Sequence, residues 1–159
     1  MRSRLIKPLR LLAIPAVIIL GACENPVQAD HEHVEEVESV EITDLAGVMI
    51  ATLQGDQWEF EDGGDALHLN PGDAMEVKIF FVAPDGDRFQ LPAAGEEHTL
   101  HVEVLNPAIV EYEAHGEHGD FNALSVGETT AEIQIYHGSH ADWQADAPLP
   151  IEVVDEGGS

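Results

Sequence analysis

The side chains best suited to chemistry lie in two short stretches built from histidine, glycine and acidic residues. The first is His115-Gly116-Glu117-His118, followed by Asp120, and the second is His137-Gly138-Ser139-His140-Ala141-Asp142. In each stretch, two imidazoles lie three residues apart beside carboxylates. Neutral imidazole is the commonest protein ligand for zinc and copper, and a carboxylate can complete the ligand shell or orient an imidazole. The two stretches therefore predict a site for a divalent transition metal. Zinc is the first candidate, and copper and nickel remain open.

The backbone must turn inside each stretch if both of its histidines are to reach one ion. On a continuous strand, residues three apart point to opposite faces. Gly116 and Gly138 permit the turn, because glycine adopts positive φ without steric cost. His98 and His101 have the same spacing, but Thr99-Leu100 between them reads as extended strand. This difference favours the other two pairs, and His101 is more simply explained as a surface residue of its strand.

Strand pairing is expected to bring these histidines together. If the tight turn at Gly127-Glu128 joins two antiparallel strands, His137 lies opposite His118. If the turn at Asn106 to Ala108 also joins two antiparallel strands, His98 lies near the first histidine stretch. We therefore predict one metal-binding cluster at one end of the fold, and its residues are His98, His115, His118, His137, His140 and Asp142.

The elements that must position this cluster are short strands separated by turns. The strongest strand spans residues 74–82, where alternate apolar residues share one face. They are Met75, Val77, Ile79 and Phe81. No segment beyond residue 22 shows a helical period over ten residues. The pattern predicts an all-β fold, an antiparallel β-sandwich of about eight to ten strands. An extra N-terminal hairpin is expected over residues 37–60.

Three segments between Leu67 and Val154 resemble bacterial Ig-like domains of group 2, the invasin- and intimin-related kind. They are Leu69-Asn70-Pro71-Gly72-Asp73, Asn106-Pro107-Ala108-Ile109-Val110-Glu111-Tyr112 and Leu124-Ser125-Val126-Gly127-Glu128-Thr129-Thr130-Ala131-Glu132-Ile133. The resemblance implies an Ig-like sandwich, and it implies no catalytic residue. The N-terminal hairpin and the histidines depart from the pattern of that family.

The first 22 residues read as a secretory signal. A basic start leads into the apolar run 11–20, which is too short to span a bilayer as a helix. The ending Leu20-Gly21-Ala22-Cys23 resembles the bacterial lipobox. That resemblance implies that Cys23 is lipidated and anchors the mature protein to a lipid membrane. Because Glu24 rather than Asp follows the cysteine, it also implies delivery to the outer membrane of the cell envelope.

The chain is thus expected to have four parts. They are a signal peptide over residues 1–22, a lipidated Cys23 with a flexible acidic tether over 23–36, a sandwich domain over 37–155, and a disordered tail over 156–159. Cys23 is the only cysteine, so the sequence excludes a disulfide, a thiolate metal site and a cysteine nucleophile.

The charge balance excludes nucleic acid as a partner. Beyond residue 22, only Lys78 and Arg88 oppose 31 acidic residues, which makes a formal charge of −29. Such a surface repels nucleic acid and attracts cations. A solvated acidic surface, as in proteins from salty habitats, is the simpler explanation of the charge as a whole, and it can coexist with a specific metal site.

These observations predict an exported, membrane-anchored lipoprotein that binds a transition metal for sequestration, buffering or delivery. The alternative is a structural or adhesive Ig-like module with incidental histidines. We expect no enzymatic activity, because the chain has no G-x-S-x-G, no H-E-x-x-H and no phosphate-binding loop. A metal-dependent hydrolase is a third and weaker hypothesis. No protein partner is identified by the sequence.

Overall fold

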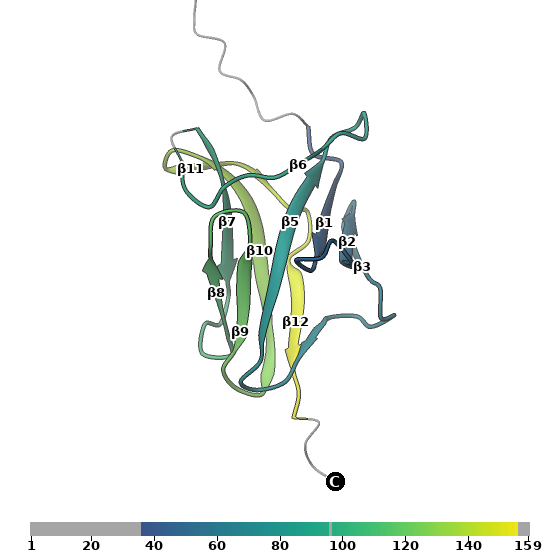
Figure 1. Ribbon diagram of the computed structural model, residues 1–159, viewed down its shortest axis with the longest axis vertical. Coiled ribbons are helices and arrows are strands. Elements are labelled where there is room, and N and C mark those ends of the chain that lie inside the picture. The colour runs from purple at the N-terminus through teal and green to yellow at the C-terminus, as the bar shows by residue number, and fades with distance from the viewer. Residues whose placement is uncertain (1–35, 96, 156–159) are drawn as a thin grey trace, which may run out of the picture. The chain divides into compact units, whose positions relative to one another are not determined.

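The computed structural model describes residues 36–95 and 97–155, which form twelve β-strands and no helix (Figure 1). The predicted all-β fold is confirmed, with more strands than expected. In these described ranges no helix is long and apolar enough to cross a membrane. The predicted signal peptide, Cys23, all but the last residue of the predicted tether and the tail over residues 156–159 lie outside the described residues.

The first sheet has seven strands in the order β3-β2-β1-β5-β9-β8, with β6 alongside β5. They are β1 (Ser39–Thr43), β2 (Met49–Gln54), β3 (Gln57–Phe60), β5 (Ala74–Val82), β6 (Arg88–Phe89), β8 (Val110–Ala114) and β9 (Gly119–Ala123). Strand β1 pairs with both β2 and β5. The predicted N-terminal hairpin is therefore one flank of this sheet.

The second sheet has five strands in the order β11-β10-β12-β4, and β7 pairs with β10 on the side opposite β11. They are β4 (Leu67–Leu69), β7 (His98–Val104), β10 (Gly127–His137), β11 (His140–Gln144) and β12 (Leu149–Val153). The sandwich was predicted to be antiparallel throughout. Strands β4 and β12 instead run parallel. Turn signals predict neighbours only between consecutive strands, and these two are far apart in the chain.

One hydrophobic core lies between the two sheets. The alternation predicted for β5 is confirmed, and its buried residues are Val77, Ile79 and Phe81. The second sheet contributes Ile133 and Ile135 of β10, which are fully buried. The Phe81 ring meets the edge of Trp143 of β11, with centroids 5.6 Å apart. This contact holds β11, which contains the end of the second histidine stretch, against the first sheet.

Two predicted strand pairings are wrong. The expected hairpin of β9 and β10 does not form, because β9 pairs with β5 and β8 while β10 belongs to the other sheet. The N–H groups of Leu124 and Ser125 instead donate to the carbonyl of Ile109 as the chain crosses between sheets. The expected hairpin of β7 and β8 is likewise divided between the two sheets. Alternation shows which face of a strand is buried, but it does not show which strand lies beside it.

A third difference concerns the segment after His137, which the sequence predicts to be a loop. Residues 140–144 instead form β11, which pairs with the end of β10. A two-residue turn at Gly138-Ser139 joins the strands, and Gly138 has φ of +62°. Such turns match the twist of the flanking strands and favour glycine where φ is positive. The polar sequence of β11 conceals it from a search for alternating apolar residues.

Replacing Phe81 with Ala tests the role of the core contact. We expect the free energy of unfolding to fall by about 3–5 kcal/mol, because a fully buried aromatic ring is replaced by a cavity. Urea denaturation measures the change. Leu105→Ala is the control, since Leu105 is 78% exposed and its loss should change stability by less than about 0.5 kcal/mol. Equal effects of the two substitutions would contradict the described core.

Candidate metal centre

The site begins with one pair of histidines on neighbouring strands. Strands β7 and β10 run antiparallel, and His98 of β7 lies directly opposite His137 of β10. Opposite residues share a face of the sheet. This face is the buried one, because the next pair on the same face is Ile135 of β10 with Leu100 of β7, and both pack into the core. The two imidazoles therefore extend the core-facing row to its rim, with ring centroids 4.9 Å apart.

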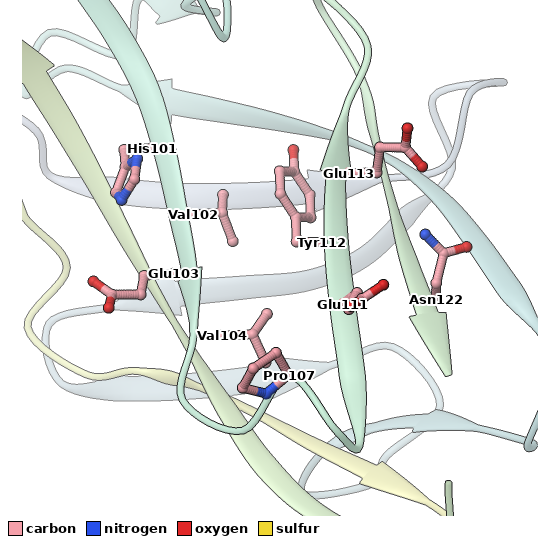
Figure 2. A pocket seen from close by; sticks show the side chains of 9 residues that line it. All are labelled: His101, Val102, Glu103, Val104, Pro107, Glu111, Tyr112, Glu113 and Asn122. Atoms are coloured by element: carbon pink, nitrogen blue, oxygen red, sulfur yellow. The ribbon is translucent and has the colours of Figure 1, made fainter. Parts of the chain in front are cut away.

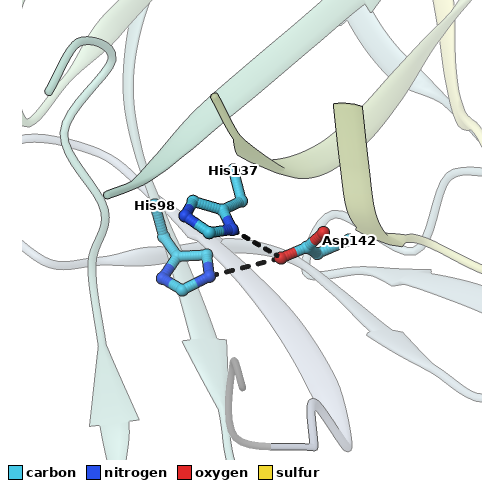
Figure 3. A group of neighbouring side chains, drawn as sticks. All are labelled: His98, His137 and Asp142. Atoms are coloured by element: carbon cyan, nitrogen blue, oxygen red, sulfur yellow. Dashed lines mark ion pairs between the residues drawn. The ribbon is translucent and has the colours of Figure 1, made fainter. Parts of the chain in front are cut away.

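A β-bulge in β11 supplies the third side chain. Ile135 pairs with Trp143 and the next residue, Tyr136, pairs with Ala141, so Asp142 has no partner on β10. A bulge changes the direction of side chains along its strand. Here the Asp142 carboxylate lies beside both imidazoles (Figure 3). Without the extra residue, Asp142 and Trp143 would point to opposite faces of a regular strand.

The three side chains form a compact ligand group. Each offers one ligand atom, and these atoms lie within 4.8 Å of one another. Oδ2 of Asp142 is 3.4 Å from Nε2 of His98 and 3.7 Å from Nδ1 of His137. Ligand atoms around a tetrahedral zinc ion lie about 3.4 Å apart, given zinc–nitrogen bonds of about 2.0–2.1 Å. The spacing therefore fits an ion of this size with little movement of the side chains.

The polar atoms of the group also fit a metal. Nε2 of His98 is buried from solvent and makes no hydrogen bond within the described structure. A buried polar atom without a hydrogen bond is rare in native proteins. An ion between His98 and Asp142 would provide the missing partner. Two imidazole nitrogens and one carboxylate oxygen form a ligand set that suits zinc, copper or nickel.

His140 contacts the same carboxylate from the outside. Its Nε2 lies 2.9 Å from Oδ1 of Asp142, the oxygen that does not face the other two imidazoles, and its side chain is 67% exposed. The His140 ring is 5.8 Å from that of His137 across the tight turn. His140 can therefore hold the carboxylate in place or move to become a fourth ligand.

The other two predicted histidine ligands do not join this group. His115 and His118 occupy the turn between β8 and β9 in the seven-stranded sheet, with ring centroids 5.6 Å apart. Their acidic neighbour is Asp120, whose Oδ2 lies 3.2 Å from Nε2 of His115. Across the described residues, His98, His137 and Asp142 are the one group of three ligand atoms this close together. The single cluster expected from the sequence is thus divided between two hairpins.

The structure agrees with the sequence interpretation of the turns. Gly116 and Gly138 have φ of +78° and +62°, and few residues other than glycine adopt such positive φ values. His101 lies within continuous strand β7, and its ring packs at a tilt against that of Tyr136, with centroids 4.5 Å apart, rather than joining the ligand group. The direct pairing of His98 with His137 was not predicted, although both are the end residues of strands with a core-facing apolar row.

A cleft of about 700 Å³ lies away from this group, between edge strands β7 and β8 (Figure 2). Its lining includes the apolar side chains of Val102 and Val104, the ring of Tyr112, and three acidic side chains, Glu103, Glu111 and Glu113. None of the three metal-ligand residues lines it. Its size alone gives no reason to place the chemistry there, since the convergent ligand atoms lie at the rim of the sandwich.

The surroundings of Asp120 affect a neighbouring tyrosine. Tyr112 of β8 packs against Phe121, with ring centroids 5.0 Å apart, and its ring leaves no room for a Cβ atom on Gly119. Burial raises the pKa of Tyr112 to about 12, and the negative charge of Asp120 adds to the shift. Both effects disfavour the phenolate form.

In comparisons with known proteins, no family profile and no curated protein matches the chain. The geometry of the candidate metal centre is therefore the main ground for a functional proposal.

An alkaline titration tests the environment of Tyr112. We expect a phenolate absorbance transition near pH 12 that disappears in Tyr112→Phe. The folded-state pKa exceeds the ordinary value of 10, so the stability that this tyrosine contributes is complete below pH 10 and is lost as the pH rises through 12. Asp120→Asn should lower the transition only in part, because burial is the larger cause. A transition near pH 10 for Tyr112 would contradict the described packing.

Proposed function

We propose that this protein binds a divalent transition metal at His98, His137 and Asp142, as an exported lipoprotein anchored to the cell envelope. One observation carries the proposal, namely three ligand atoms from three strands within 4.8 Å of one another. The binding would serve sequestration, buffering or delivery of the ion. Zinc is the first candidate, and the ligand set also suits copper and nickel.

The chain's own residues divide the work of binding. His98 and His137 supply neutral nitrogen ligands from the rim of the core, and Asp142 supplies an anionic oxygen that partly balances the charge of the ion. His140 holds Oδ1 of this carboxylate at 2.9 Å and fixes its orientation. A bound ion would satisfy Nε2 of His98, which lacks a hydrogen bond.

Envelope anchoring is supported by the sequence alone. The basic start, the apolar run and Leu20-Gly21-Ala22-Cys23 resemble a lipoprotein signal. More than one acyl chain on Cys23 would hold the protein stably at a membrane. The acidic surface would raise the local concentration of cations near the site. We propose binding rather than catalysis, because no described residue beside the ligand group stands out as a general base.

A second candidate function is a structural or adhesive module of Ig-like type. The two-sheet architecture and the resemblance of residues 67–154 to bacterial Ig-like domains favour it. In that case Asp142 and the imidazoles would stabilise one another as ion pairs, without any metal. The measurement that separates the two functions is metal affinity.

Titration calorimetry of the purified protein with Zn²⁺ tests the metal site. We expect His98→Ala, His137→Ala and Asp142→Asn each to lower the affinity at least about tenfold, or about 1.4 kcal/mol, because each removes one of three ligands. His68→Ala is the matched control. His68 also contacts two acids, Asp62 and Glu152, but lies on β4. Equal, weak binding by the wild type and by all four variants would favour the acidic surface or the structural module instead.

Affinity should also depend on pH. An imidazole must be neutral to bind a metal, so we expect the Zn²⁺ dissociation constant to rise steeply as the pH falls below about 6. Calorimetry at a series of pH values measures the change. Binding that stays constant from pH 7 to pH 5 would show that carboxylates alone hold the ion.

A further inference from the structure

The pattern His-Gly-x-His-small-Asp occurs twice in the chain. Residues 115–120 read His-Gly-Glu-His-Gly-Asp, and residues 137–142 read His-Gly-Ser-His-Ala-Asp. The second copy contains two of the three ligands of the candidate metal centre. The first copy contains His115, His118 and Asp120, which that centre does not use.

Both copies fold into the same local arrangement. In each, the glycine has positive φ and the chain reverses between two antiparallel strands, β8–β9 and β10–β11. The two rings lie 5.6 Å apart in the first copy and 5.8 Å apart in the second. In the first copy His115 contacts the aspartate at 3.2 Å, and in the second copy His140 and His137 contact it at 2.9 and 3.7 Å. The similarity therefore extends from the sequence to the turn and to the spacing of the two rings, whereas the aspartates differ, since Asp142 lies in a bulge and Asp120 pairs regularly with Glu113.

A separate observation at Asp120 indicates a missing partner. Its Oδ1 is buried from solvent and makes no hydrogen bond within the described structure, as is also true of Nε2 of His98, on the strand beside the other hairpin. Asp120 of β9 also lies between Glu76 of β5 and Glu113 of β8, directly opposite each of them. Like charges opposite one another on a sheet destabilise it, and a bound cation relieves the repulsion.

We propose that the hairpin between β8 and β9 is a second divalent-metal site, formed by His115, His118 and Asp120. The site takes the same class of ion as the first, Zn²⁺, Cu²⁺ or Ni²⁺, because it has the same ligand types. This inference rests on the proposed function, since it takes the β10–β11 hairpin as a metal site. The two sites belong to different sheets, so the protein binds two ions per chain.

The second site is the weaker one. At the first site a neighbouring strand adds His98, and three ligand atoms already converge. At the second, His115 and Asp120 lie 3.2 Å apart, but the ligand atoms of His115, His118 and Asp120 do not all converge in this way, so the side chains must move to share an ion. Ordering side chains on binding opposes affinity. We therefore expect the two sites to differ by at least about tenfold in affinity.

Calorimetry with Zn²⁺ and the absorbance of bound Co²⁺ count the ions on the full-length purified protein. The wild type should bind two ions, one more tightly. His115→Ala with His118→Ala should remove the weaker ion and leave the tighter one, and His98→Ala with His137→Ala should do the reverse. His68→Ala is the control and should retain both. The urea midpoint of each variant verifies that it is folded. If the variant with His115→Ala and His118→Ala unfolds, a variant with His115→Gln and Asp120→Asn is used instead.

The outcomes separate this inference from the proposed function. One ion in the wild type that persists without His115 and His118 overturns the second site and leaves the first intact. One ion that is lost in either double variant means a single shared site and also overturns the inference. No specific ion in the wild type overturns both proposals. Two ions that are lost separately support both.

Discussion

The register between β7 and β10 is the constraint on which the metal centre depends. It places His98 opposite His137 at the end of a row whose other members, Leu100 and Ile135, pack into the core. Burial of that row fixes the register, because a slip by one residue would turn the whole apolar set toward solvent. The same slip would place the two imidazoles on opposite faces of the sheet. The hydrophobic core thus positions polar ligands that contribute little to it.

Much of the fold could be predicted from local patterns. Strand β5 has the predicted bounds, Ala74–Val82, because alternating apolar residues and flanking turns both mark it. Strand β11 could not be found this way, since its residues are mostly polar and its pairing depends on a turn at Gly138. The partners of β9 and β10 were also beyond the local pattern. Which strands become neighbours depends on how two sheets close around one core, and this is a property of the whole chain.

The candidate site shows the same division between local and long-range information. Spacing identified the histidines, Asp142 and the need for a turn, and positive φ at Gly116 and Gly138 agrees with it. Spacing placed all of them in one cluster, whereas the structure places the two hairpins in different sheets. The bulge that directs Asp142 toward His98 has no signature in the sequence. Any of several residues near the turn could have been the residue of β11 that lacks a partner on β10. Ligand identity was therefore easier to predict than ligand grouping.

The position of β7 and β11 has a consequence for local unfolding. Both are edge strands of the five-stranded sheet, and each pairs only with β10 among the described strands. Edge strands open more readily than central ones, because fewer hydrogen bonds and contacts hold them. An ion shared by His98, His137 and Asp142 joins both edges to the central strand, so neither can detach without releasing it. At a free-ion concentration 100 times the dissociation constant, this linkage adds about 2.7 kcal/mol to the free energy of opening. Amide exchange and proteolysis at the two edges would then report the supply of metal around the protein.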